Sequence, residues 1–139
     1  MIFWDSSALV RLLVTEPGSA ECGRLLREDP VVVVWWGTPV ECESALQRRL
    51  REGSLTAGGV SQARRALDQL ATAWLEVPPG EELRRLARRL LRTHPLRAAD
   101  ALQLAAALSL AGRGIEKLRF ASADQCLAQA AEIEGLEVV

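Results

Sequence analysis

The stretch MIFWDSSALVRLL, residues 1–13, decides the fold class of this chain. Its first residues are apolar and end at Asp5, and the residues after Asp5 space their apolar side chains as a helix does. A short apolar run that stops at an acid and passes directly into such a segment is typical of a buried β-strand followed by a helix. We therefore expect the chain to open with a strand and a helix, with Asp5 at the carboxyl end of the strand.

A second unit of the same kind follows. The run VVVVWW, residues 31–36, is β-branched and aromatic, which predicts a central strand buried on both faces. Gly37 ends this strand, and Thr38 and Pro39 begin the next helix, with proline at the first helical position. We expect this helix to run to about Glu52.

The remaining segments continue the alternation. The spacing predicts helices over residues 20–27, 56–73, 81–92, 96–111 and 124–133, and short strands over residues 74–77, 118–121 and 136–139. Alternating helices and buried strands predict a three-layer α/β/α domain with a mainly parallel central sheet. The length of 139 residues suits one domain, residues 1–139.

Composition excludes several classes of protein. The chain is 49% hydrophobic and 25% charged, which is ordinary for a globular protein and not for a disordered one. Its longest strongly apolar run, residues 31–36, is too short to cross a bilayer. The N-terminus has no basic region and reaches an acid at Asp5, so we expect no signal peptide, no membrane attachment and a cytoplasmic protein.

The cysteines and the histidine indicate no metal site or nucleophile. Cys22, Cys42 and Cys126 are widely spaced and form no C-x-x-C pair, which favours small buried thiols in a reducing compartment over disulfides or a zinc site. His94 stands directly before Pro95, a position typical of a loop or a helix cap. A single histidine in this setting supports neither a histidine-rich metal site nor a Ser-His-Asp triad.

The acidic residues gather at one edge of the expected sheet. Asp5 and Asp124 follow two strands at their carboxyl ends, and parallel central strands bring such carboxylates to the same rim. Glu41 opens the helix after the valine-rich strand. Asp100 shares a helix face with Leu104, so we expect its carboxylate to point inward near the helix start. A buried carboxylate without a cation or donor is costly, so these acids together favour a bound cation.

Helix capping is the alternative explanation for the same acids. Residues 38–41 and 122–125 each fit a capping box, and Asp5 and Asp124 each fit a plain N-cap. Asp100 fits capping poorly, unless its helix begins only at the next residue. We therefore expect one shared cation site in preference to separate caps.

The ligand type selects the cation. The acids offer only carboxylate oxygens, with no histidine or cysteine nearby in sequence, which favours Mg²⁺ or Mn²⁺ over zinc or copper. Acids that bind Mg²⁺ at a sheet rim are typical of phosphoryl chemistry, in which the metal activates a water and neutralises the charge of the transition state. The chain has neither a G-x-x-x-x-G-K nor a G-x-G-x-x-G loop, so we expect no nucleotide-hydrolysing or dinucleotide-binding function.

Several segments, in order, resemble PIN-domain ribonucleases, in particular the VapC-type toxins of prokaryotic toxin–antitoxin pairs. They are DSSALVR at residues 5–11 with EPGS at 16–19, VECESAL at 40–46, LRAADALQLA at 96–105 and FASADQCLAQAA at 120–131. The resemblance implies a metal-dependent endoribonuclease that acts as a toxin, forms a homodimer and is held inactive by a VapB-type antitoxin. It implies as catalytic and metal-binding acids Asp5, Glu41, Asp100 and Asp124, and as supporting hydroxyls Ser7 and Ser122.

Two assignments stay open beside this set. Glu43 lies two residues from Glu41 on the same helix, and periodicity does not choose between them, although the family spacing favours Glu41. The arginine stripe from Arg84 to Arg92 is most simply a solvated helix face, with an RNA backbone or an acidic partner as alternatives. Arg11, Arg48 and Arg49 are candidates for contacts to RNA phosphates.

Two other functions compete with a ribonuclease. A receiver-like Mg²⁺-binding signalling domain also gathers acids at strand ends, but receivers have two adjacent acids after the first strand and a lysine after a late strand. Here Asp5 stands alone, and Lys117 precedes its strand. A non-catalytic PIN-like module that binds RNA or protein would keep the fold without the chemistry, and the presence of the whole acid set argues against it.

Overall fold

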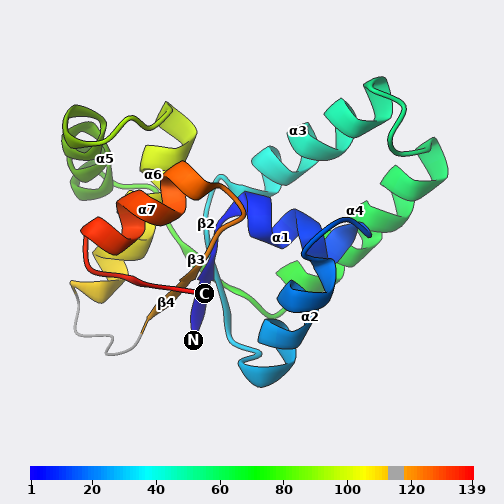
Figure 1. Cartoon of the computed structure of the whole chain (residues 1–139), viewed down its shortest axis with the longest axis horizontal. Coiled ribbons are helices and arrows are strands. Elements are labelled where there is room, and N and C mark those ends of the chain that lie inside the picture. The colour runs from blue at the N-terminus through cyan, green and yellow to red at the C-terminus, as the bar shows by residue number, and fades with distance from the viewer. Residues whose placement is uncertain (113–117) are drawn as a thin grey trace.

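A parallel sheet forms the centre of the molecule (Figure 1). The computed structural model describes residues 1–112 and 118–139, so Lys117 lies outside the described residues. The strands in these ranges are β1 (Ile2–Trp4), β2 (Val32–Trp35), β3 (Leu75–Val77), β4 (Arg119–Ala121) and β5 (Glu137–Val138). They lie in the order β3-β2-β1-β4-β5, and each neighbouring pair is parallel. The mainly parallel sheet expected from the sequence is confirmed.

Helices cover both faces of this sheet, so the three-layer α/β/α architecture is also confirmed (Figure 1). One face carries α1 (Ser6–Leu13), α2 (Ser19–Glu28), α3 (Thr38–Arg51) and α4 (Ala57–Ala71). The other carries α5 (Glu81–Thr93), α6 (Ala98–Ala111) and α7 (Gln125–Ile133). Within β1, Ile2 and Trp4 belong to the first core and Phe3 to the second. This placement explains why the strand is apolar at every position.

Strand and helix ends differ from the sequence expectation by one or two residues. β2 is shorter than the run of residues 31–36, and the side chains of Val31 and Trp36 at its two ends are 41% and 55% exposed. The helix expected from residue 96 begins at Ala98, since Arg97 has an extended backbone and serves as its N-cap. These ends depend on which side chains the neighbouring elements cover, which a local pattern does not contain.

The structure corrects one expectation about the cysteines and confirms the one about the histidine. Cys22 and Cys42 are buried, but Cys126 is exposed, because it lies in the first turn of α7 on its outer side. His94 is the C-cap of α5, as expected of a loop or cap residue, and its Nε2 lies 2.8 Å from Glu134 Oε1. In the described ranges, no helix is both long and apolar enough to cross a membrane.

The strand order explains why one edge of the sheet collects functional residues. β1 lies between β2 and β4, and the chain order reverses there, which is where ligands bind in open parallel sheets. The helices α1, α3 and α7 begin within a few residues of the carboxyl ends of β1, β2 and β4. Their first turns therefore meet at this edge.

Candidate functional site

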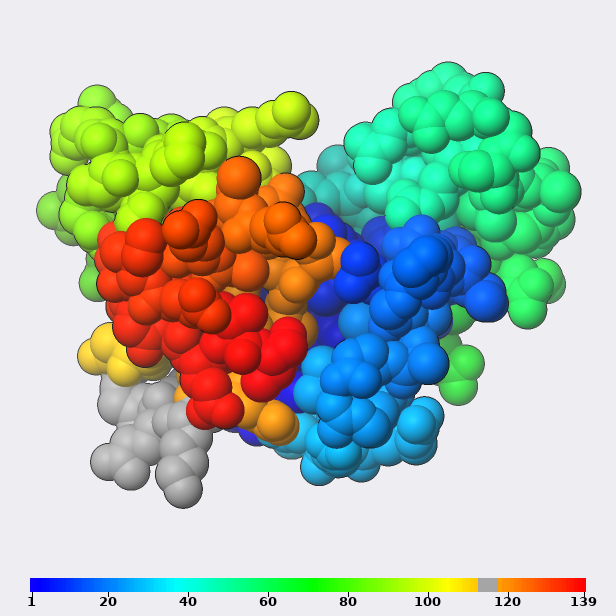
Figure 2. All heavy atoms as spheres, in the orientation of Figure 1, coloured from blue at the N-terminus to red at the C-terminus, as the bar shows by residue number. Residues whose placement is uncertain are grey.

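A hollow of about 430 Å³ lies where these first turns meet. Its lining includes Glu41 from α3, Asp100 from α6 and Asp124 from the start of α7. In the space-filling view it lies by the notch between the α6–α7 side and the α3 side (Figure 2). A larger hollow of about 660 Å³ by α2 and α4 is mostly apolar and contains none of the predicted acids. The acid-lined pocket is therefore the candidate site.

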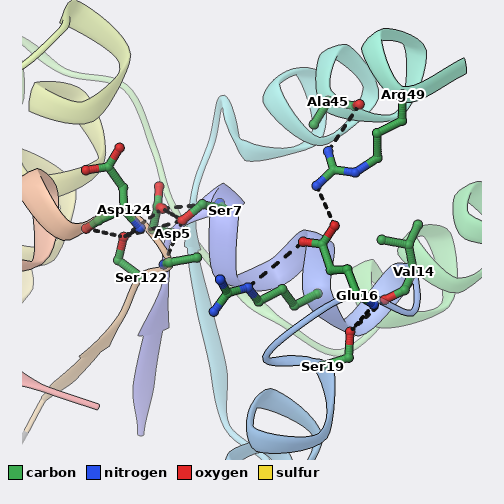
Figure 3. Close-up of polar contacts among 11 residues, drawn as sticks. Asp5, Ser7, Val14, Glu16, Ser19, Ala45, Arg49, Ser122 and Asp124 are labelled. Carbon is green, nitrogen blue, oxygen red and sulfur yellow. Dashed lines mark hydrogen bonds and ion pairs between the residues drawn. The ribbon is translucent and has the colours of Figure 1, made fainter. Parts of the chain in front are cut away.

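Asp5 is buried and does not itself line the pocket, but it is hydrogen-bonded to Ser7, which does. Asp5 directly follows β1, and only 3% of its surface is exposed. Its Oδ2 accepts hydrogen bonds from the Ser7 backbone N–H at 3.2 Å and the Ser122 hydroxyl at 3.1 Å, and also from the Ser7 hydroxyl (Figure 3). Burial raises the pKa of Asp5, and the hydrogen bonds from Ser7 and Ser122 oppose this shift. Both predicted supporting serines, Ser7 and Ser122, thus donate hydrogen bonds to this carboxylate.

Glu41 is held between two helices. Its Oε2 accepts hydrogen bonds from the Ser6 hydroxyl at 2.8 Å and from Gln103 Nε2 at 3.1 Å. Gln103 is fully buried, and its Nε2 lies 3.2 Å from the Thr38 hydroxyl. Burial raises the pKa of Glu41, and these hydrogen bonds only partly offset the effect.

Gln103 belongs to the candidate site, although the sequence pattern did not single it out. It lies on α6, three residues after Asp100, so one helix presents Asp100 to the pocket and supports Glu41 from behind. In the described part of the chain its Oε1 is buried without a hydrogen-bond partner. An amide on an otherwise alanine- and leucine-rich helix was the available signal, because a buried polar group needs a specific partner.

Asp100 and Asp124 both line the pocket and cap helices. Asp100 Oδ2 accepts a hydrogen bond from the Arg97 backbone N–H at 3.2 Å, so the expectation that capping explains Asp100 poorly is wrong. The reason is that α6 begins at Ala98, which makes Asp100 its third residue. Asp124 Oδ1 accepts from the Leu127 N–H at 2.9 Å, as an N-cap does. Capping and a pocket position are therefore compatible in the same side chain.

The capping box expected at residues 38–41 does not form. The N-cap of α3 is Gly37, without a side-chain cap, and Glu41 turns to Ser6 and Gln103. Glu43 lies on the outer side, where Arg64 Nε approaches Oε2 at 2.9 Å and Oε1 at 3.1 Å. Hydrogen bonds from Arg64 lower the pKa of Glu43 to about 2. Of the two candidate glutamates, Glu41 is the one in the pocket.

The four predicted acids influence one another electrostatically. Burial is the main cause of the raised pKa values of Asp5, Glu41 and Asp100. The negative charge of Asp100 raises the pKa of Asp5 and of Glu41 further, and the negative charge of Asp124 raises the pKa of Asp100 further. In the described part of the chain none of them takes part in an ion pair. Asp5, Glu41 and Asp100 are at least partly buried, and among the described residues only Asp100 of these three is eased by a nearby positive charge, that of Arg97. Like charges in such positions are unfavourable, and a bound cation would relieve them.

The donor set suits a hard divalent cation, because it consists of carboxylate and hydroxyl oxygens. Among residues 1–112 and 118–139, however, no three acid, histidine or cysteine side chains stand close enough to hold one ion together. The pocket therefore offers oxygen ligands of the kind that hard divalent cations prefer, but the described residues do not form a preformed metal cage.

The predicted arginines divide into two groups. Arg11 and Arg48 line the pocket, as does Arg49. In the stripe on α5, Arg84 pairs with Glu81 of the same helix, and Arg89 pairs with Glu134. No stripe residue lines the acid pocket. These contacts favour the solvated-face interpretation of the stripe.

The raised pKa values predict that stability without metal falls as pH rises. Asp5, Glu41 and Asp100 hold protons more tightly in the folded chain than in the unfolded chain, where carboxyl groups titrate at about pH 4. Their stabilising contribution is complete below that pH and is lost as pH rises through the folded pKa values.

We therefore expect the melting temperature in chelator to decrease from about pH 5 to about pH 7, with a weaker decrease in Asp5→Asn. Glu43, Glu21 and Glu134 have lowered pKa values, and their contribution instead disappears at lower pH. Thermal melts of both proteins across this range test the expectation. Equal slopes for the two proteins would contradict it.

The amino-acid sequence of the chain matches a known protein family. Residues 2–133 match the family model described as PIN domain. Two curated proteins of Mycobacterium tuberculosis, Ribonuclease VapC45 and Ribonuclease VapC49, are each 30% identical over 115 residues, which is 83% of this chain and 80% of the relative.

Solved structures share the fold. Mycobacterium tuberculosis VapC20, described as a sarcin-ricin loop cleaving toxin, superposes with a TM-score of 0.70 at 21% identity, covering 94% of this chain and 95% of that chain. A toxin-antitoxin complex from Klebsiella pneumoniae superposes with a TM-score of 0.66 at 16% identity, covering 100% and 96%. At these identities the likeness concerns the fold alone.

Proposed function

The chain belongs to the PIN domain family and, within it, to the VapC ribonucleases, and from this premise we propose that it is a Mg²⁺- or Mn²⁺-dependent endoribonuclease that acts as the toxin of a toxin–antitoxin pair. The observation that carries the proposal is the set of Asp5, Glu41, Asp100 and Asp124 at one edge of the sheet. Three of them line one pocket, and the fourth, Asp5, is buried and hydrogen-bonded to Ser7 of the pocket lining. Because residues 2–133 match the PIN domain model, the alternative of a receiver-like signalling domain is rejected.

In the proposed reaction, the oxygen of a water bonds to the phosphorus of an RNA phosphodiester and one P–O bond breaks, so that the leaving oxygen takes up a proton and becomes a hydroxyl while the phosphate stays on the other fragment. A divalent cation, when bound by these acids, supplies a water of lowered pKa and neutralises charge on the phosphate. Ser7 and Ser122 hold the Asp5 carboxylate, and Ser6 and Gln103 hold that of Glu41. Hydrogen bonds of this kind fix the direction of the carboxylate oxygens before the ligand arrives, which lowers the cost of ordering them.

Cleavage of RNA by the purified protein tests the proposal. We expect cleavage of a single-stranded RNA with Mg²⁺ or Mn²⁺, and none when excess chelator removes the ion, because the acids then repel the phosphate and activate no water. A change of at least about a hundredfold is expected, since metal ions contribute several kcal/mol to such reactions. Restoring the metal to the same sample should restore cleavage.

Two results would overturn this function. Cleavage that persists in chelator would contradict the metal-dependent mechanism. RNA binding without cleavage, with all four acids intact and metal present, would instead support a non-catalytic PIN-like module.

We further propose a VapB-type antitoxin as partner, a homodimer as the assembly, and the cytoplasm as the location. The solved structures that share the fold include a toxin-antitoxin complex and VapBC2 from Rickettsia felis bound to a DNA fragment from their promoter. Growth on expression of this chain, with and without the gene directly upstream, tests the partner, and sizing at micromolar concentration tests the dimer. In the proposed role, Arg11 and Arg48 contact RNA phosphates from the other wall of the pocket.

A further inference from the structure

The acid pocket has a second wall of opposite charge. Arg11 on α1 and Arg48 and Arg49 on α3 line it, together with Glu16 from the turn between α1 and α2. Acids and arginines thus share one hollow of about 430 Å³. Pockets of about 300–1,000 Å³ commonly enclose a small-molecule ligand, so this one has room for a nucleotide unit.

Glu16 links two of these arginines. Its Oε2 accepts a hydrogen bond from Arg49 Nη2 at 2.7 Å (Figure 3). Its Oε1 lies 3.9 Å from Arg11 Nε. Arg49 is also tied to its own helix, because Nη1 donates to the Ala45 carbonyl at 3.3 Å. All three side chains of the link are only 22–31% exposed. Arg49 is thus engaged on two sides, whereas Arg11 meets Glu16 at ion-pair distance only.

The turn before α2 holds Glu16 and Arg11 in place. Ser19 Oγ accepts a hydrogen bond from the Glu16 N–H at 2.9 Å and donates one to the Val14 carbonyl at 2.8 Å (Figure 3). Gly18 has a φ of 92°, which favours glycine, and a Cβ there would lie 2.6 Å from Arg11 Nη1. The guanidinium of Arg11 therefore packs directly against the backbone of Gly18, in a conformation that other residues rarely adopt.

We propose that Arg11 binds a backbone phosphate of the RNA next to the phosphate that is cut, and that Glu16, braced by Arg49, is its positioning residue. The inference rests on the proposed function, since it places the cut phosphate at the acid wall. One carboxylate against three guanidiniums leaves the basic wall positively charged. An adjoining phosphate is thereby attracted to the side of the pocket that faces the acids, and a guanidinium fork suits its oxygens.

Removing the carboxylate of Glu16 is a sharp test, because a pure charge effect and a loss of positioning change the KM for RNA in opposite directions. Glu16→Ala makes the pocket more positive, so electrostatic attraction alone would lower KM for RNA. If Glu16 positions Arg11, the loss of its ordering instead raises KM, by about three- to tenfold, with kcat nearly unchanged. Arg11→Gln is expected to raise KM by about tenfold and to reduce the slope of log KM against log salt by about 0.7, the value for one phosphate contact on a single strand.

Glu43→Ala is the matched control. It removes a glutamate that pairs with an arginine, Arg64, and changes the net charge equally, but outside the pocket. Its KM is expected to stay unchanged or fall slightly. In a double mutant, Glu16→Ala should add no further rise in KM to Arg11→Gln, because the positioned group is already absent.

The outcomes separate the inference from the proposed function. A lower KM in Glu16→Ala, or additive effects in the double mutant, overturns the positioning role, as does a loss of kcat and melting temperature at unchanged KM. If the unmodified chain cuts no RNA, the proposed function fails. Fluorescence anisotropy of a fluorescein-labelled single-stranded RNA, measured in chelator, then still tests whether Arg11, positioned by Glu16, binds an RNA phosphate. Weaker binding by Arg11→Gln and Glu16→Ala, but not by Glu43→Ala, would then support it, and equal binding by all four proteins would overturn it.

Discussion

Asp5→Asn is expected to reduce RNA cleavage by on the order of a hundredfold or more, while raising the melting temperature of the metal-free protein. Asparagine keeps the size of the side chain and an oxygen that accepts the Ser7 N–H, so the cap on α1 survives. It carries no negative charge, so it holds a cation poorly. Stability rises because burial raises the pKa of Asp5, and its ionised form is therefore unfavourable near neutral pH.

Single-turnover cleavage with Mg²⁺ and thermal melts in chelator measure the two effects. Asp100→Asn provides the comparison. It should lose most of its activity as well but gain less stability, because Asp100 is only partly buried, whereas Asp5 is 3% exposed. Metal-independent cleavage by either purified variant would contradict the assigned roles, and a lower melting temperature in Asp5→Asn would contradict the electrostatic argument.

Glu41→Gln and Glu43→Gln are expected to differ by on the order of tenfold to a hundredfold in cleavage, although the two residues are neighbours on one helix. Glu41 lies in the pocket, held by Ser6 and Gln103, and its charge adds to that of the other acids. Replacing it with the neutral amide removes one of the proposed cation ligands, so the metal concentration for half-maximal activity should rise.

Glu43→Gln should leave cleavage within about twofold, because its carboxylate pairs with Arg64 on an exposed surface and such pairs contribute little. A titration of cleavage rate against Mn²⁺ for both variants measures the difference. The reverse order of effects would show that the side of α3 assigned to the pocket is wrong.

The sequence allowed the order of elements and the position of most acids to be predicted. Asp5 follows an apolar strand, and Asp124 follows the segment Arg119–Ala121, so their places at the carboxyl ends are consequences of strand boundaries. The parallel register of β1 with β4 then brings these ends together. The capping expectations show the limit of such reasoning. Asp100 proved to be a cap and Glu41 did not, because capping depends on where a helix begins.

Local periodicity therefore determined the α/β/α fold, because the alternation of apolar segments is encoded residue by residue along the chain. Only the tertiary structure decided that Glu41, not Glu43, enters the pocket, that Gln103 supports it across 62 residues of sequence, and that Glu16 meets Arg49 across 33. The physical reason is distance along the chain. A short-range pattern records which side chains share a face, whereas contacts between faces depend on the free energy of packing the complete sheet and its helices.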